Sequence, residues 1–172
     1  NDVTVEYNDN NIIKAEKAEF NENEEIFKTF GPTNIITKQK YTVIGRDIVI
    51  NNKNKTIISN KLASINDPEG NYIELQNFNY QLENNIFKSI GSVKILDKLK
   101  NSYEFSQIYI DTKKKEILGT DIKAFFNEES IKVNPNNKPR VFANTIKISS
   151  KKSIFDKSIF TICDYRENDK CP

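Results

Sequence analysis

The stretch Ile-Phe-Lys-Thr-Phe-Gly at residues 26–31 returns as Ile-Phe-Lys-Ser-Ile-Gly at residues 86–91. With these two blocks aligned, residues 26–59 lie over residues 86–119 without a gap. A third, partial copy covers residues 141–151, where Ile146 and Ile148 match Ile48 and Ile50. Chance matching in a chain rich in Ile and Lys would give scattered coincidences, whereas this block is followed by further matches in the same alignment. The pattern indicates internal duplication.

Each repeated unit predicts β-strands joined by tight polar turns. Apolar residues stand two apart in Ile48-Val49-Ile50, Ile108-Tyr109-Ile110 and Ile146-Lys147-Ile148, which is the period of a half-buried strand. Asn, Asp, Ser and Lys follow each of these segments, as in hairpin turns. Turn signals recur roughly every 8–12 residues, and no long segment shows the helical period. The sequence therefore predicts an all-β fold of stacked short strands.

Two kinds of interruption are expected along this stack. Gly31 and Gly91 occupy matching positions and predict a bend or bulge within a strand. Residues 134–139, Asn-Pro-Asn-Asn-Lys-Pro, form a loop by composition. Because repeat units lie on both sides of that loop, we interpret it as an insertion, and we expect residues 1–172 to form a single domain.

Stacked units of this kind contact only their neighbours, so matching Ile positions align into ladders along one face. The two ends of the stack expose unpaired backbone groups to which another β-protein can add a strand. The architecture therefore predicts an apolar path with a pairing edge at each end.

The composition argues against several functional classes. Lys and Arg number 26 against 24 Asp and Glu, a balance that gives no basic excess for nucleic-acid binding. The chain has no His, which excludes a Ser-His-Asp triad and His-ligated zinc. No Gly-rich phosphate loop is present. We therefore expect no catalytic residues, no metal and no cofactor, and we do not expect an enzyme.

The two cysteines, Cys163 and Cys171, lie at the end of the chain. With no other Cys and no His they cannot assemble a structural zinc site, so a disulfide is expected. The residues leave open whether this disulfide is local or reaches a partner outside the sequence. The chain starts at Asn1 and not at Met, which fits a mature chain or an excised piece.

Several short motifs follow one another in an order that resembles a known family. They are Asn10-Asn11-Ile12-Ile13-Lys14-Ala15, Ala18-Glu19-Phe20, Gly31-Pro32-Thr33-Asn34-Ile35 and Gly45-Arg46-Asp47-Ile48. This series is similar to the OstA-like domain of lipopolysaccharide transport proteins. The C-terminal part, with Phe142-Ala143-Asn144, Phe160-Thr161-Ile162-Cys163 and Cys171-Pro172, resembles the outer-membrane assembly branch of that family more specifically.

The resemblance implies a folded-over antiparallel sheet, a β-jellyroll or β-taco, with an apolar interior along which lipopolysaccharide acyl chains move. It implies a location at the outer membrane on the periplasmic side. The implied partners are lipopolysaccharide, the periplasmic bridge protein LptA by edge-strand addition, and the lipoprotein LptE through a C-terminal barrel. The sequence contains nothing resembling that barrel, so we expect a periplasmic fragment. The resemblance also implies a long-range disulfide at Cys163, while Cys171 offers a local one.

The residues that the resemblance assigns to the lipid path are the repeated aliphatic and aromatic positions. They are Phe27, Ile35, Ile48, Ile50, Ile57, Phe87, Ile95, Ile108, Ile110, Ile117, Ile146 and Ile148. On the residues alone, a packed core is the favoured explanation of these positions, and it is the resemblance that favours a lipid path. Turn lysines such as Lys53, Lys55 and Lys113–Lys115 can meet lipid phosphates, but in a Lys-rich chain solvated turns are the favoured explanation.

Two alternative functions remain open from the sequence. The chain can be a free-standing periplasmic bridge protein of the same family, similar to LptA. It can also be a structural or carbohydrate-binding β-solenoid without a lipid path. Polysaccharide-active solenoids, however, generally need clustered acidic residues and exposed aromatic residues on one ladder, and neither occurs in register here.

Overall fold

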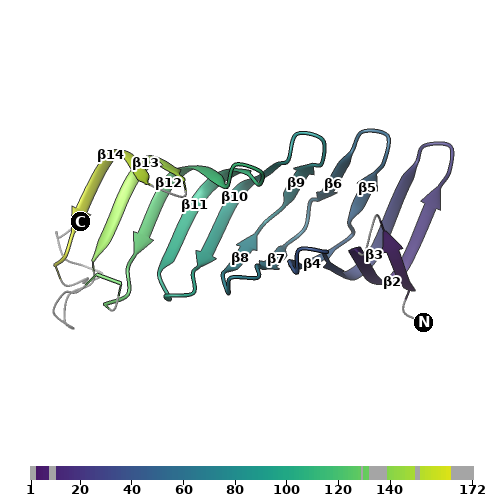
Figure 1. Ribbon diagram of the computed structural model, residues 1–172, viewed down its shortest axis with the longest axis horizontal. Coiled ribbons are helices and arrows are strands. Elements are labelled where there is room, and N and C mark those ends of the chain that lie inside the picture. The colour runs from purple at the N-terminus through teal and green to yellow at the C-terminus, as the bar shows by residue number, and fades with distance from the viewer. Residues whose placement is uncertain (1–2, 8–10, 129, 132–138, 150–151, 164–172) are drawn as a thin grey trace.

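The computed structural model describes residues 3–7, 11–128, 130–131, 139–149 and 152–163, and among them no residue is helical. Fourteen strands form one continuous antiparallel sheet, laid out as a row in Figure 1. The all-β prediction is therefore confirmed. The strands are β1 Val3–Tyr7, β2 Asn11–Asn21, β3 Ile26–Ile36, β4 Thr42–Arg46, β5 Val49–Asn51, β6 Thr56–Ser59, β7 Ala63–Asn66, β8 Tyr72–Leu75, β9 Phe78–Gln81, β10 Ile86–Leu96, β11 Ser102–Asp111, β12 Glu116–Phe125, β13 Arg140–Ile148 and β14 Ser153–Thr161.

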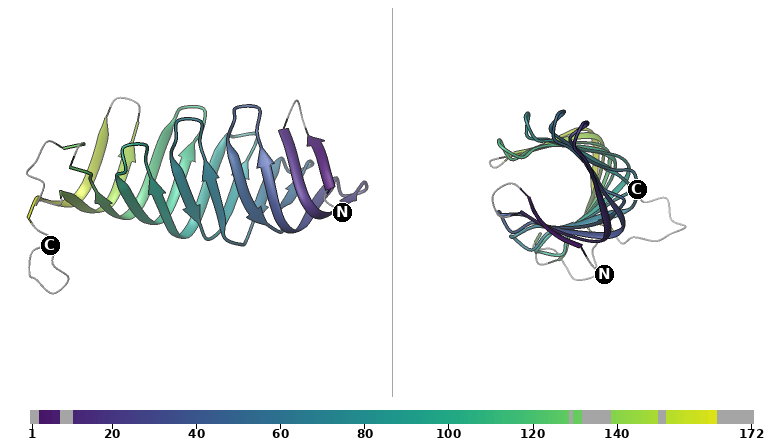
Figure 2. Two further views of the ribbon diagram at one scale, coloured as in Figure 1. Left: turned by 90° about the horizontal axis from the view of Figure 1, so that it is seen from below. Right: turned by 90° about the vertical axis from the view of Figure 1, so that its right-hand side faces the viewer.

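The sheet is bent lengthwise into two arms. Strand β3 pairs with β5 along its first half and with β4 along its second half, and β10 pairs with β9 and β8 in the same way. We call the side that contains β5, β6 and β9 arm A, and the side that contains β1, β4, β7 and β8 arm B. Long strands such as β3 and β10 run through both arms. Seen end-on, the cross-section is C-shaped and open on one side (Figure 2).

Turns recur at regular intervals along the two free borders of the C. On arm A the last turn residue has a left-handed backbone at Glu25, Lys55, Asn85 and Lys115. On arm B the same conformation occurs at Lys40, Gly70 and Lys100. We call these borders rim A and rim B. Since Lys55 lies midway between the matching positions Glu25 and Asn85, the sequence repeat contains two structural units of equal length.

The long strands change direction at the predicted glycines. Gly31 and Gly91 have φ of 76° and 105°, which favours glycine, and a register shift separates Ile90 from Val93. A Cβ at Gly91 would lie 2.5 Å from Oε1 of Gln76, so a larger residue there would also clash with the Gln76 side chain. The predicted bend is confirmed. Because β3 and β10 continue through it, they are longer than the short strands expected from the sequence.

Where other strands are interrupted at the bend, buried hydroxyl groups form hydrogen bonds with the backbone. The Ser59 hydroxyl donates to the Arg46 carbonyl at 2.8 Å, and the Ser89 hydroxyl donates to the Asn77 carbonyl at 2.6 Å. The Thr29 hydroxyl accepts from the Ile48 amide at 2.9 Å. Thr29, Ser59 and Ser89 occupy the same position in successive structural units, and all three are buried. They supply hydrogen bonds to backbone groups at the interruptions of the ladder.

Residues 132–138, which include most of the predicted loop, lie outside the described residues. Strands β12 and β13 on either side of this segment pair directly, with Ile117 opposite Ile148 and Phe125 opposite Arg140. The segment therefore joins two neighbouring strands of the same sheet.

Candidate functional site

The inner face of arm A carries an unbroken ladder of apolar side chains next to rim A. Each residue is the direct cross-strand partner of the next, from β2 to β13. The ladder runs Phe20, Phe27, Ile50, Ile57, Tyr80, Phe87, Ile110, Ile117, Ile148. Seven of its nine members were predicted from the sequence, and Phe20 and Tyr80 were not.

A second ladder follows the inner face of arm B next to rim B. It runs from β2 to β14 through direct cross-strand pairs. Its members are Ile13, Ile35, Val43, Ile65, Ile73, Ile95, Tyr103, Ala124, Val141 and Phe160. Only Ile35 and Ile95 were predicted. Val43 and Tyr103 differ when the two copies are aligned, and the remaining members lie outside the aligned ranges, although the even spacing of Val43, Ile73 and Tyr103 is visible in the sequence.

The space between these ladders, at the bend, is packed. Ile48, Phe78, Ile108 and Ile146 are buried there, and they alternate across the strands with the small residues Ser59, Ser89 and Gly119. All twelve predicted path residues belong to a single apolar cluster or pack against it. Six of them are buried, and Phe27, Ile57, Ile95, Ile110, Ile117 and Ile148 are half-buried. The cluster is therefore fully packed at the bend, and along the two ladders its half-buried members lie among buried ones.

The apolar face is open at both ends of the sheet. Phe20 on β2 is 55% exposed, and Phe160 on β14 is 57% exposed, although each occupies an inner-face ladder position. In the described part of the sheet, β14 has only β13 as a neighbour, and the arm A half of β2 has only β3. These two edges leave both backbone groups and apolar side chains without a covering strand.

The two arms are joined near the N-terminal end by a hydrogen bond across the open side. The Tyr7 hydroxyl, on β1 of arm B, donates to Oδ1 of Asn52 in a rim A turn. The Tyr7 ring also packs against the apolar cluster. This contact holds the rims together at that end of the sheet.

Rim B is stabilised by a repeated turn of Asp and Asn. Asp97 Oδ1 accepts from the amides of Leu99 and Asn101, at 2.9 and 2.8 Å. The Asn101 side chain donates to Asp97 Oδ2 at 2.8 Å and accepts from the Asn127 amide of the next turn at 2.8 Å. Asp67 and Asn71 repeat the arrangement in the preceding turn of the same rim. Burial and the nearby Asp97 charge raise the pKa of Tyr103, whose hydroxyl donates to Asp97, to about 12.

Cys163 lies beside a buried arginine at the C-terminal end of the described chain. It is disulfide-bonded, while Cys171 lies outside the described residues. Nη1 of Arg140 donates to the Cys163 carbonyl at 2.9 Å, and Nη2 lies 3.6 Å from its sulfur. The disulfide is thus anchored against strand β13.

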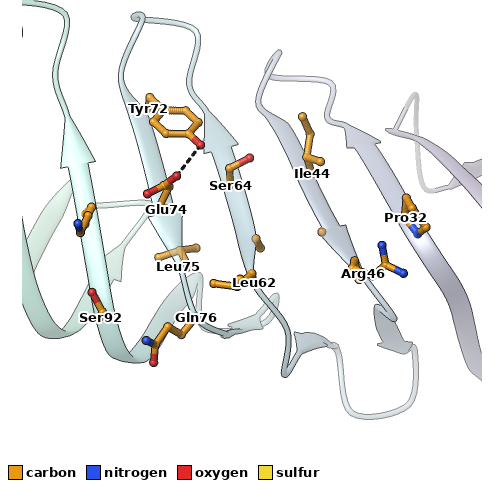
Figure 3. Close-up of a pocket in the computed structure, with 13 residues that line it drawn as sticks. Pro32, Ile44, Arg46, Leu62, Ser64, Tyr72, Glu74, Leu75, Gln76 and Ser92 are labelled. Carbon is orange, nitrogen blue, oxygen red and sulfur yellow. Dashed lines mark hydrogen bonds between the residues drawn. The ribbon is translucent and has the colours of Figure 1, made fainter.

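The outer face has shallow depressions of its own. The larger one, of about 560 Å³, lies over β4, β7 and β8. Figure 3 shows Ile44, Leu62 and Tyr72 along it, with the Tyr72 hydroxyl donating to Glu74 at 3.1 Å. Because Ile44 and Tyr72 alternate with the inner-face residues of the same strands, this depression lies mainly on the outer face, although Ala63 and Leu75 of the apolar cluster also line it.

Neither a metal site nor a helical membrane span is found in the part of the chain that the structure describes. No group of three or more His, Cys, Asp or Glu side chains there has the arrangement of metal ligands. No helix in the same part is long and apolar enough to cross a membrane.

The fold is similar to that of LptH, described as the LptA homologous periplasmic component of the conserved lipopolysaccharide transport device from Pseudomonas aeruginosa. The TM-score is 0.55 and the sequence identity is 17%, over 62% of this chain and 79% of LptH. No protein-family profile matches the sequence, and no curated protein is similar to it in sequence. The comparison supports the folded-over jellyroll that the resemblance implies.

Proposed function

We propose that this chain conducts the acyl chains of lipopolysaccharide along its inner face, as a non-enzymatic module of outer-membrane assembly. The observation that carries the proposal is the pair of unbroken apolar ladders that flank the open side of the sheet. The likeness in fold to a component of a lipopolysaccharide transport device supports the same function.

Acyl chains would lie against the half-buried side chains of the cluster. Residues such as Ile110 and Ile117 are already partly exposed beside rim A, so an acyl chain that enters from the open side covers them without unpacking the buried residues at the bend. Each methylene that leaves water contributes about 0.8 kcal/mol. Since the ladders are continuous, that free energy stays nearly level along the sheet. The inner face therefore guides the lipid, and its net movement needs a driving force from elsewhere.

The two ends of the sheet suit the addition of similar modules. An edge strand of a periplasmic bridge protein such as LptA can extend the sheet beside β14 or beside the exposed half of β2. Phe160 and Phe20 then become inner rungs of a longer ladder instead of exposed side chains. Strand addition thus continues both the hydrogen bonds and the apolar surface.

Within this function, the C-terminal residues favour the outer-membrane protein LptD over a free-standing bridge protein. The segment Phe160-Thr161-Ile162-Cys163 supports an LptD-like periplasmic domain, which would act at the outer membrane with LptE. The coding sequence after Pro172 tests this choice. A continuation long enough for a barrel supports LptD, and a stop codon directly after Pro172 supports the LptA-like alternative.

The lipid path is tested by a charge placed on either face of one strand. Ile117 and Leu118 are neighbours on β12, but Ile117 packs against the inner cluster and Leu118 is on the outer face and 51% exposed. An unpaired carboxylate among acyl chains is strongly unfavourable. We expect Ile117→Asp to weaken binding of purified lipopolysaccharide about tenfold or more, and Leu118→Asp to leave it within about twofold.

Folding is monitored by circular dichroism in both variants, and Ile110→Asp repeats the inner-face test on β11. Equal binding by the inner-face and outer-face variants would overturn the proposal.

A further inference from the structure

The turns along the two rims carry charge in bands. Rim A holds acidic residues at 22–25, lysines at 52–55, one glutamate at 82–85 and three lysines at 112–115. Rim B holds two lysines at 37–40, Asp67 and Glu69 at 67–70, two lysines beside Asp97 at 97–100, and Glu128 in the turn after β12. Successive turns along the sheet alternate between the rims, because each long strand, or each consecutive pair of short strands such as β4 and β5, runs from one rim to the other. Their order is therefore acidic, basic, basic, acidic, acidic, basic, basic, acidic.

Each basic pair of turns places lysines on both sides of the open side. The turns with Lys40 and Lys55 are one strand apart along the sheet, on opposite rims, and the turns with Lys100 and Lys115 repeat this. All four lysines are exposed. Whereas Lys114 pairs with Asp111 at 3.3 Å, no carboxylate of the described chain forms an ion pair with these four.

These four lysines occupy backbone positions that suit other residues better. Their φ angles are 65°, 53°, 63° and 55° at Lys40, Lys55, Lys100 and Lys115. Gly and Asn adopt this left-handed conformation most readily, and the chain itself has Gly70 and Asn85 at equivalent turn positions. Asn is as abundant in the sequence as Lys, so composition alone does not explain four lysines at these positions. A positive charge at the rim is thus kept despite a conformational cost.

We propose that Lys40 with Lys55, and Lys100 with Lys115, form two stations that bind the phosphate groups of an amphiphile whose acyl chains lie on the inner face. The inference rests on the proposed lipid path and adds the head-group chemistry to it. The apolar ladders lie directly beneath both rims, so a lipid seated there presents its head group at the level of the turns. Lysine ammonium groups are suitable partners for that anion.

The spacing of the stations predicts where head groups rest. The two stations are four strands apart, and strands lie about 4.8 Å from one another, which gives roughly 19 Å. The turns between them carry Asp67, Glu69 and Glu83, which repel a phosphate. An anionic lipid therefore has two preferred positions along the sheet, separated by an unfavourable band, and its movement proceeds in steps.

The test removes charge without disturbing the turns. Lys40→Asn with Lys55→Asn, and Lys100→Asn with Lys115→Asn, place a residue that favours the left-handed conformation at each site. Lys88→Gln with Lys123→Gln removes the same charge from the outer face, where neither lysine forms an ion pair with a described carboxylate, and serves as the matched control. Binding is measured with lipid A that carries two phosphates, with the same lipid after removal of its phosphates, and at low and high salt.

We expect the variant that combines all four substitutions to bind phosphorylated lipid A about fivefold more weakly and to lose salt dependence. Each two-lysine variant keeps one station, so its binding should weaken only about twofold. Binding of the dephosphorylated lipid stays unchanged in every variant, and thermal stability is equal to or above that of the parent chain. If the station variants bind phosphorylated lipid A as the outer-face control does, the stations are refuted while the lipid path stands. If the parent chain binds neither lipid, the proposed function itself fails.

Discussion

Replacing Gly119 by Ala tests how tightly the two arms are packed at the bend. A Cβ at Gly119 would lie 2.5 Å from Cδ1 of Phe105 and 2.7 Å from its Cε1, well inside an ordinary carbon–carbon contact. Phe105 is buried in the cluster, so its ring has little room to retreat. Overpacking of this kind costs about 1–3 kcal/mol. Because Gly→Ala also restricts the unfolded chain, which stabilises by about 0.4–1 kcal/mol, we expect a net loss of about 1–2 kcal/mol.

Gly45 is the matched control for this substitution. A Cβ there would meet Ile48 Cδ1 at 3.4 Å and the Ala63 Cβ at 3.6 Å, which are ordinary contacts, and its φ is not left-handed. We expect Gly45→Ala to be neutral or stabilising by up to about 1 kcal/mol. The free energy of unfolding is measured in urea, and Tm should fall by roughly 2–8 °C for Gly119→Ala.

Shortening the opposing side chain identifies the contact responsible. In the double variant Phe105→Leu with Gly119→Ala, the added methyl group no longer meets the ring, so the combined loss should fall short of the sum of the two single losses by about 1 kcal/mol. Equal stability of Gly119→Ala and Gly45→Ala, or strictly additive losses in the double variant, would refute the packing that we describe at the bend.

Three further outcomes are expected at the rims. Asn101→Ala should cost about 1–3 kcal/mol in urea unfolding, and Asn71→Ala less, because both lose the same turn contacts but Asn101 is buried and Asn71 is half-buried. Since the folded pKa of Tyr103 is raised to about 12, its stabilising contribution is complete below the ordinary tyrosine pKa of about 10 and is lost as the pH rises through that window. The free energy of unfolding should therefore fall more in the parent chain than in Tyr103→Phe when the pH is raised from below about 10 to above it; both are measured by urea unfolding. Tyr7→Phe keeps the ring but removes the hydrogen bond to Asn52, which should lower stability by about 1 kcal/mol; an unchanged value would show that this contact does not hold the rims.

The sequence predicts the strand period and the bend, but the repeat that it shows is twice as long as the structural unit. Identical residues recur in every second structural unit, and the charge of the rim turns alternates with the same period. The intermediate unit keeps the inner-face pattern with different residues, such as Phe78 and Tyr80 where the preceding unit has Ile48 and Ile50. A comparison by residue class, at half of the repeat distance, would detect it.

Much of arm B was missed for a related reason. Val43, Ile73 and Tyr103 occupy one ladder, but they share no side-chain type that self-comparison by identity could register. The buried hydroxyls of Thr29 and Ser59 were missed because their role depends on interruptions in neighbouring strands, which only the folded sheet reveals. The predicted path residues were found because Ile and Phe recur there unchanged.

The lipid path is tested most directly by photocrosslinking to lipopolysaccharide from neighbouring positions on one strand. A photoreactive amino acid at Ile117 points toward the inner cluster, and the same residue at Leu118 lies on the outer face. The proposed path predicts a lipopolysaccharide adduct at position 117 and little or none at position 118. Equal adducts at both positions, or an adduct confined to position 118, would contradict it.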